Sequence, residues 1–360
     1  MASDPNALPL SEHGGEVDAA AELYGITRDR WLDLSTGINP HAYPLPELAR
    51  DYWRRLPDAS LYAWLRESAA ACYGVADPAA VVPAGGSQSI IQLLPRLLPP
   101  RRVAVVTPTY REHAASWTAA GHCVAEIADI DAVPADAAVV VVANPNNPDG
   151  RQCNPEALLP LSEGRLLVVD EAFADVCPEI SLARHAGRGD LLVLRSFGKF
   201  FGLAGLRLGF ALAGEPLAEQ LRRAIGPWAV SGPAAVVGAV ALADESWVRA
   251  TRVRLTAAAG RLDGLLLRAG LNIIGGTTLF RLIEHGRAAE LFEALAHAAV
   301  LVRRFAGEPH RLRFGLPADD VAFSRLADAL AQWRPQPAPP QVGAATPARR
   351  PARASGGQGR

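Results

Sequence analysis

Residues 137–145 read AAVVVVANP, in which an unbroken apolar run stops abruptly at a polar Asn-Pro pair. A run without alternating polar residues is typical of a β-strand covered on both faces, because every side chain then points into apolar surroundings. Strands of this kind occur mainly in parallel sheets flanked by helices. This stretch therefore restricts the chain to folds with a central sheet between helical layers.

Further apolar runs before residue 200 repeat the same arrangement. Helix-like segments separate them, such as residues 87–98 and a segment at about 110–120. Strands that alternate with helices indicate an α/β domain with a mainly parallel sheet. The strands predicted on this basis are AVVP (80–83), RVAVVTP (102–108), AAVVVVANP (137–145), RLLVVDEA (165–172) and DLLVLRSF (190–197).

After residue 245 the pattern changes to that of a smaller α+β domain. We expect a long amphipathic helix at 245–269 and shorter elements after it, while residues 335–360 are rich in Pro, Ala, Gly and Arg and predict a disordered tail. The later elements are strands at about 278–283, 299–303 and 311–314 and helices at about 287–298 and 319–333. The predicted division is an N-terminal segment (1–40) that packs with the small domain, a large domain (41–245), a small C-terminal domain (246–334) and the tail (335–360).

The charge balance argues against several classes of protein. The chain has 36 basic and 37 acidic residues, so no overall field attracts nucleic acid or an anionic membrane. No apolar run reaches the roughly 18 residues that span a bilayer, and the first residues lack a secretory signal pattern. We therefore expect a cytoplasmic protein without nucleic-acid or membrane partners. The four scattered cysteines predict neither a disulfide framework nor a metal site.

Lys199, in the glycine-rich stretch SFGKFFGLAGLRLG (196–209), is the only lysine of the sequence. The other 35 of the 36 basic residues are arginines (36 − 1 = 35). An arginine serves wherever only positive charge is needed, whereas a lysine amine can lose its proton and act as a nucleophile or base. Lys199 is therefore predicted to carry out chemistry that an arginine cannot.

Polar sequences follow four of the predicted strands, and ligands of open α/β sheets gather at such strand ends. They are GGSQS (85–89), ANPNNPDG (143–150), DEAFAD (170–175) and the segment around Lys199. The chain contains no G-x-x-x-x-G-K-[ST] loop and no G-x-G-x-x-G fingerprint, which argues against a phosphate-loop hydrolase and a dinucleotide enzyme.

In order and spacing, these four motifs resemble those of the fold-type I pyridoxal-phosphate (PLP) enzymes of the aminotransferase family. The resemblance covers about residues 13–333: a Gly-Ser turn, N-P-x-x-P-x-G, D-E-A, and S-x-x-K with an arginine eight residues after the lysine. It implies a large PLP-binding domain with a mainly parallel sheet and a smaller C-terminal domain. It also implies a homodimer with shared active sites.

The resemblance assigns a role toward PLP to each matching residue. PLP is an aldehyde that needs an amine to hold it, and Lys199 is the only candidate. Asp170 is expected to pair with the ring nitrogen, Asn147 to donate to the ring hydroxyl, and Tyr110 to stack on the ring. Tyr62 is expected to reach the phosphate of the neighbouring subunit. The cofactor phosphate is assigned to Gly86, Ser87, Gln88, Ser196 and Arg207.

Within the family, HGG (13–15) and LDLSTGINP (32–40) resemble the threonine-phosphate decarboxylases of cobalamin biosynthesis. In those enzymes the N-terminal segment lies over the active site and helps to bind the substrate phosphate. Arg303 matches a second phosphate ligand, although Arg304 is an open alternative, and Arg313 matches the arginine that binds the substrate carboxylate. The residues assigned to the substrate are His13, Gly14, Ser35, Thr36, Gly37, Asn39, Asn147, Arg303 and Arg313.

Phe173 further separates the possible reactions. Related aminotransferases commonly have a tyrosine at this position, whose hydroxyl donates to the cofactor ring oxygen, and its loss fits a decarboxylase better. The expected function is decarboxylation of O-phospho-L-threonine to (R)-1-amino-2-propanol O-2-phosphate and CO2. The alternatives are histidinol-phosphate aminotransferase or another amino-acid aminotransferase, and a non-catalytic PLP-fold binding or regulatory protein.

Overall fold

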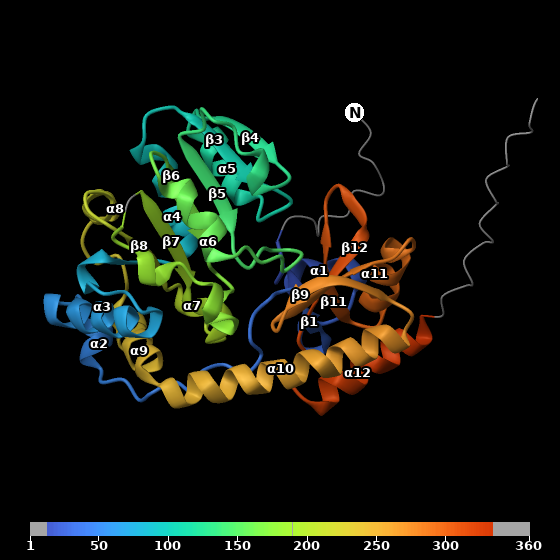
Figure 1. Ribbon diagram of the computed structural model, residues 1–360. Helices are drawn as coiled ribbons and strands as arrows, with labels where there is room; N and C mark the ends of the chain where they lie inside the picture. The colour runs from blue at the N-terminus through green and yellow to red at the C-terminus, as the bar shows by residue number, and fades with distance from the viewer. Residues whose placement is uncertain (1–12, 189, 334–360) are drawn as a thin grey trace, which may run out of the picture.

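A seven-stranded sheet forms the centre of the larger part of the molecule in the computed structural model, which describes residues 13–188 and 190–333 (Figure 1). Its strand order is β2-β8-β7-β6-β5-β3-β4, and β8 alone among these strands runs antiparallel to its neighbours β2 and β7. The bounds are Val81–Ala84 (β2), Arg102–Val106 (β3), Cys123–Ile127 (β4), Val139–Ala143 (β5), Leu166–Asp170 (β6), Leu191–Ser196 (β7) and Gly209–Ala213 (β8).

This sheet confirms the predicted α/β class and the five strands expected within it. All five residues of β5 are buried, as its unbroken apolar run requires. The sequence did not predict β4, a partly exposed edge strand with a glutamate inside it, or β8, which is short and rich in small residues. The expected helix over 87–98 is shorter, because Pro95 follows α4 (Ser87–Leu93) and the chain continues as a 3₁₀ turn.

Helices cover the two faces of this sheet (Figure 1). The longest of them is α3, and Asp58 directly before it is its N-cap, whose carboxylate accepts a hydrogen bond from the backbone amide of Leu61. Apart from α4, the helices of this part are Asp51–Arg54 (α2), Ala59–Tyr73 (α3), Glu112–Ala119 (α5), Pro155–Leu158 (α6), Phe197–Phe200 (α7), Leu217–Ile225 (α8) and Gly232–Ala243 (α9).

A second sheet, of five strands in the order β1-β11-β12-β10-β9, lies in the smaller part of the molecule. Strand β1 comes from the N-terminal segment and pairs in parallel with β11, Leu32 opposite Val300. The expected strands correspond to β10, β11 and β12, whereas β9 was not predicted because two glycines interrupt its apolar pattern. The bounds are Leu32–Leu34 (β1), Asn272–Thr277 (β9), Phe280–Glu284 (β10), Val300–Phe305 (β11) and Glu308–Gly315 (β12).

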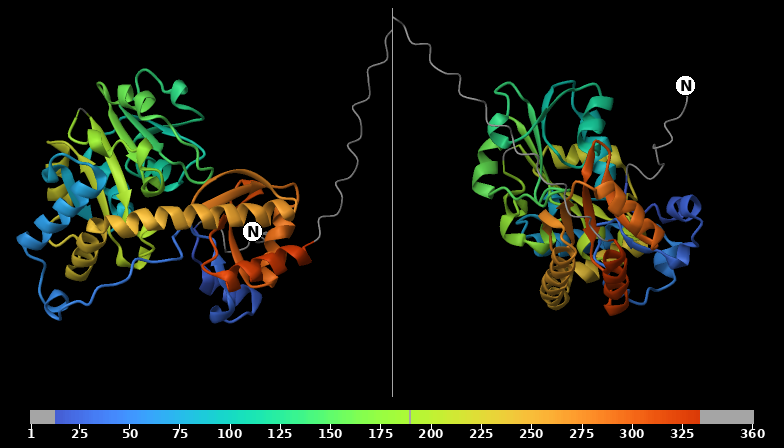
Figure 2. Two further views of the ribbon diagram at one scale, coloured as in Figure 1. Left: turned by 60° about the horizontal axis from the view of Figure 1, so that its bottom comes forward. Right: turned by 90° about the vertical axis from the view of Figure 1, so that its right-hand side faces the viewer.

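Helix α10 (Glu245–Arg268) runs from the large sheet to the small one, close to its predicted bounds (Figures 1 and 2). Its C-terminal half lies beside α12 (Asp320–Gln332), and Arg261 of α10 pairs with Asp320 at 2.5 Å. The small sheet is also covered by α1 (Val17–Tyr24) and by α11 (Ala288–His297). No helix within 13–188 or 190–333 is long and apolar enough to cross a membrane. The predicted tail lies outside the described residues.

Candidate active site

A cavity of about 330 Å³ lies where strands β5, β6 and β7 end. Its wall includes the strand-end residues Asp170 and Ser196, residues of the small domain, and part of the N-terminal segment. The motifs singled out in the sequence therefore meet in one place, as expected for carboxyl ends of parallel strands. The predicted residues that line the cavity are His13, Gly14, Thr36, Gly37, Gly86, Ser87, Gln88, Tyr110, Asn147, Asp170, Ser196, Lys199, Arg207, Arg303 and Arg313.

Lys199 reaches this cavity from α7, a single helical turn that follows β7 directly. Phe197 and Phe200 on the same turn are buried and anchor it in the core. Burial lowers the pKa of Lys199 to about 8, with a further lowering by Arg313, while Asp170 acts in the opposite direction. A substantial fraction of the lysine is therefore neutral near physiological pH, which is the form that can bond to an aldehyde.

Asp170 ends β6, and its carboxylate is fixed by two hydrogen bonds. Oδ1 accepts from the amide of Ala172 at 3.0 Å, and Oδ2 lies 2.8 Å from Nε2 of buried His113. His113 was not predicted, although it follows the expected ring-stacking Tyr110 by three residues. It lies in the first turn of α5, and Tyr110 precedes this helix. A carboxylate so oriented suits a protonated pyridine nitrogen.

Gly86 and Arg207 form the corner of the cavity that was assigned to the cofactor phosphate. Gly86 has a φ of +88°, and a Cβ built on it would lie 2.8 Å from Nη2 of Arg207. The backbone of Arg207 is in the left-handed conformation (φ 53°), and its Nη1 donates to the carbonyl of Ala204 at 3.1 Å. Because residue 86 is a glycine, the Arg207 guanidinium can lie close to the backbone at the start of α4. Together these groups form a site that fits a phosphate dianion.

Asn147 and Arg313 contact each other across the cavity. Nη1 of Arg313 donates to Oδ1 of Asn147, and Nη2 donates to the carbonyl of Ser35 at 2.9 Å. The amide of Asn147 then has its Nδ2 hydrogens available, in keeping with its expected donor role. Nε of Arg313 is buried without a partner among the described residues. Burial lowers the pKa of Arg313 to about 9, with a further lowering by Arg303 and an opposing effect of Asp33, so the site favours an added anion.

Three predicted residues do not line the cavity, and each has other partners. Ser35 accepts from the Gly15 amide at 2.7 Å and donates to Asp33 at 2.6 Å. The side-chain Nδ2 of Asn39 donates to the backbone carbonyl of Phe200 at 2.8 Å, and the backbone N–H of Asn39 donates to the backbone carbonyl of Lys199 at 2.9 Å. The hydroxyl of Tyr62 bonds to the backbone of Val230, accepting at 2.8 Å and donating at 3.1 Å. Asn39 thus ties the N-terminal segment to the lysine turn, whereas the Ser35 hydroxyl bonds within the N-terminal segment.

The structure also distinguishes Arg303 from its neighbour Arg304. Arg303 lines the cavity, whereas Arg304 does not and has its guanidinium 4.8 Å from the centre of the Phe292 ring. Alternation along β11 explains this difference, since successive side chains of a strand point to opposite faces. The geometry therefore favours Arg303 as the residue that faces a ligand.

Comparison with known proteins agrees with this geometry. The model of the family "Aminotransferase class I and II" matches residues 30–330. The chain belongs to this family. It is 49% identical to a threonine-phosphate decarboxylase of Sinorhizobium sp and 45% identical to one of Pseudomonas aeruginosa, and both matches cover 89% of this chain and 97% of the relative.

Solved structures of the same fold include a histidinol-phosphate aminotransferase of Sinorhizobium meliloti in complex with pyridoxal-5'-phosphate. Its TM-score is 0.76 at 21% identity, over 92% of this chain and 98% of that one. An L-threonine-O-3-phosphate decarboxylase of Porphyromonas gingivalis has a TM-score of 0.70 at 20% identity, over 83% and 98%. These likenesses confirm the predicted fold-type I architecture.

Several residues at or beside the cavity were not predicted from the sequence. Besides His113, they include Arg111, which lines the cavity, and Glu112, which accepts from Gln88 at 3.1 Å and from Gln92 at 2.8 Å. Glu112 also lies 3.8 Å from Nε2 of His13. Arg111 and Glu112 directly follow Tyr110, so their place beside a predicted residue was the one available signal.

Proposed function

We propose that the protein is a PLP-dependent threonine-phosphate decarboxylase. It converts O-phospho-L-threonine to (R)-1-amino-2-propanol O-2-phosphate and CO2, a step of cobalamin biosynthesis. The close similarity to enzymes named for this activity supports the proposal, because the histidinol-phosphate aminotransferases among the relatives are only 30–32% identical. The cytoplasmic location remains a prediction from the sequence.

The observation that carries the substrate assignment is the number of anion-binding side chains on the cavity wall. Arg207 would bind the cofactor phosphate and Arg313 a substrate carboxylate. His13 and Arg303 also line the cavity, where they would meet a third anion. A phosphorylated amino acid supplies that third anion, whereas an unphosphorylated amino acid does not.

The described residues fit PLP at each of its polar groups. Lys199 would hold the aldehyde carbon, Asp170 the ring nitrogen, Asn147 the ring hydroxyl, and Gly86, Ser87, Ser196 and Arg207 the phosphate. Tyr110 would cover the ring, and its hydroxyl donates to Gln88 at 3.0 Å, which fixes the ring plane of the tyrosine. When bound, PLP serves as an electron sink for the pair left at the substrate Cα as CO2 departs.

The protein residues would orient the substrate and move a proton. His13 and Arg303 would hold the substrate phosphate at a distance from the reacting bond, so remote binding energy fixes the direction of the scissile bond. Lys199 has a pKa of about 8 and can carry a proton to Cα after CO2 leaves. Delivery of the proton to Cα would complete the amino-alcohol phosphate.

A homodimer with shared active sites is part of the proposal. Large apolar side chains are exposed around the start of α3: Leu45 is 66%, Trp53 68%, Leu56 64% and Trp228 56% exposed. Exposed apolar groups gathered in this way are typical of an interface. Tyr62 lies on α3 in the same region, which is consistent with its predicted place near a second subunit.

The direct test is to incubate the purified protein and PLP with O-phospho-L-threonine, without a keto acid, and to measure CO2. Release of CO2 with formation of the amino-alcohol phosphate is expected. No CO2, together with amino transfer from histidinol phosphate to 2-oxoglutarate, would overturn the proposal. Sedimentation of the wild-type protein and of Trp53→Asp tests the dimer, which the charged residue is expected to weaken.

A further inference from the structure

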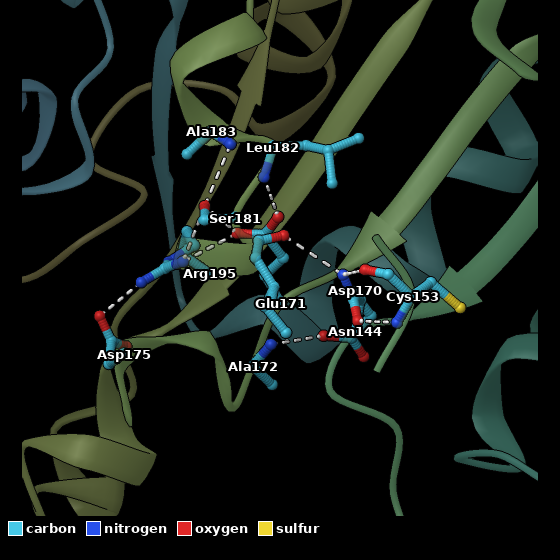
Figure 3. Close-up of polar contacts among 11 residues, drawn as sticks. Asn144, Cys153, Asp170, Glu171, Ala172, Asp175, Ser181, Leu182, Ala183 and Arg195 are labelled. Carbon is cyan, nitrogen blue, oxygen red and sulfur yellow. Dashed lines mark hydrogen bonds and ion pairs between the residues drawn. The ribbon is translucent and has the colours of Figure 1, made fainter. Parts of the chain in front are cut away.

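A buried group of charged residues, which we call the ion cluster, lies behind the ends of β6 and β7 and consists of Glu171, Asp175 and Arg195 (Figure 3). Arg195 donates through Nη1 to Glu171 at 2.8 Å and through Nη2 to Asp175 at 2.5 Å. The three residues are only 0%, 3% and 3% exposed, and none of them lines the active-site cavity. The ion cluster therefore touches no ligand directly.

Further hydrogen bonds hold the Glu171 carboxylate in one orientation. Oε1 accepts from the amide of Leu182 at 2.6 Å and Oε2 accepts from the hydroxyl of Ser181 at 2.5 Å (Figure 3). The guanidinium carbon of Arg195 lies 4.2 Å from the centre of the Tyr73 ring. The planar guanidinium of Arg195 thus contacts the two carboxylates at its edges and the Tyr73 ring at one face.

Each member of the ion cluster is close in sequence to a residue of the cavity wall. Glu171 follows Asp170, Arg195 precedes Ser196, and Asp175 lies two residues after Phe173. Because successive residues of an extended chain point to opposite sides, the ion cluster and the cavity share the same two strand ends. The ion cluster thus connects the strand end that carries Asp170 with the strand end that carries Ser196, in addition to the backbone hydrogen bond from Glu171 to Leu194 at 3.0 Å.

The ion cluster is also tied to the long helix α10. Nε of Arg252 on this helix donates to the carbonyl of Asp175 at 2.7 Å. The guanidinium of Arg252 lies 5.8 Å from the ring centre of Phe200, the neighbour of Lys199. The segment that carries Phe173 and Asp175 and the turn that carries Lys199 thus contact the same arginine.

Stability alone is a poor explanation for such a cluster. Burying charges is costly, and apolar side chains of similar size often stabilise a protein as well or better. In the ion cluster, Oδ2 of Asp175 and Nε of Arg195 are buried without hydrogen-bond partners in the described part of the chain. Charged pairs also fix the relative orientation of their members, which apolar packing does not. Here one planar guanidinium donates a hydrogen bond to each of two carboxylates, and this fixes the angle between them.

We propose that Glu171, Asp175 and Arg195 are positioning residues that hold Asp170 and Ser196 at the separation which the ring nitrogen and phosphate of PLP require. This inference rests on the proposed cofactor roles of Asp170 and Ser196. The ion cluster acts through these two residues.

The test compares PLP binding with folding stability. In the triple variant Glu171→Gln, Asp175→Asn, Arg195→Met the charges are removed, while the amide oxygen at position 171 can still accept from Leu182 or Ser181. We expect the dissociation constant of PLP to rise at least tenfold and the absorbance band of the bound cofactor to shift. Leu326→Ala, a fully buried site on α12, is the matched control, because it loses stability through a cavity far from the strand ends.

The control is expected to bind PLP within twofold of the wild-type protein despite a lower melting temperature. A triple variant with wild-type affinity and spectrum would overturn the proposal. If the triple variant does not fold, Arg195→Lys is measured instead, because it keeps the positive charge but loses the planar guanidinium. An unchanged dissociation constant of PLP in this variant would again overturn the proposal, and a rise of about threefold or more would support it. A wild-type protein that binds PLP but releases no CO2 would contradict the proposed reaction only.

Discussion

The side-chain nitrogen of Lys199 lies 5.7 Å from the centre of the Phe173 ring. Phe173 is buried, and its ring packs edge-on against Phe280 with centroids 5.1 Å apart. The phenylalanine ring beside Lys199 has no hydroxyl, so it offers the lysine amine no hydrogen-bond partner. This contact connects the lysine to the position where related aminotransferases commonly have a tyrosine.

Phe173→Tyr is therefore expected to change the outcome of the reaction more than the fold. A hydroxyl at the ring tip would be placed near Lys199 and the cofactor, and we expect CO2 release to slow about tenfold while a transamination side product increases. The ratio of CO2 to keto product, with the melting temperature as control, measures this. An unchanged ratio with a slower rate would contradict the assigned role of Phe173.

Lys199→Ala is expected to abolish the visible absorbance band of covalently bound PLP and at least 99.9% of CO2 release, because no second lysine can replace it. Lys199→Arg keeps the positive charge but cannot bond to the aldehyde, so it is the matched control and should lose the band as well. A band retained by Lys199→Arg would show that positive charge is sufficient at this position and that a nucleophilic amine is not required.

The lowered pKa of Lys199 predicts how cofactor loading depends on pH. Only the neutral amine attacks the aldehyde, so the initial rate of PLP loading onto apoprotein should rise with pH, reach half its maximum at pH about 8 and level off about one pH unit higher. Stopped-flow absorbance between about pH 6 and 11 measures this rate. A midpoint near the ordinary lysine value of about 10.4 would contradict the lowering of this pKa by burial and by Arg313.

Much of the fold could be predicted from local patterns. The valine run of β5 and the long amphipathic α10 produce clear signals within a few residues. Strand β8 does not, because its small residues are specified by packing between β2 and β7, and the three strands are brought together only by folding. The same limit explains β9, which contains Gly275 and Gly276.

The site shows a similar division. Lys199, Asp170 and Asn147 belong to motifs whose order along the chain could be read directly. His113 could not be assigned, because its partner Asp170 is 57 residues away and their contact exists only after folding. The pair Glu171 and Arg195 was missed for the same reason, since each lies beside a recognised motif residue but faces away from the cavity.

Substitutions in the N-terminal segment and on β11 test the third anion site. His13→Ala and Arg303→Ala should each raise the KM for O-phospho-L-threonine by about tenfold or more, because each removes a cavity-lining group that is proposed to bind the substrate phosphate. The reaction of unphosphorylated threonine, measured with the same variants, is the control and should change little. Arg304→Ala, on the other side of β11, should have a small effect, and equal losses for both substrates would contradict the assignment.

Gly86→Ala tests the corner assigned to the cofactor phosphate. The added methyl would lie 2.8 Å from the Arg207 guanidinium, and the φ of +88° is strained for any residue with a Cβ. Arg207 would have to move, so we expect the PLP dissociation constant to rise at least tenfold, while the melting temperature falls by only a few degrees, corresponding to ~1 kcal/mol of backbone strain. Gly205→Ala, in the turn directly before Arg207, is the control, because the methyl there would meet nothing within 4 Å. If the two alanine variants bind PLP equally well, the phosphate does not occupy this corner.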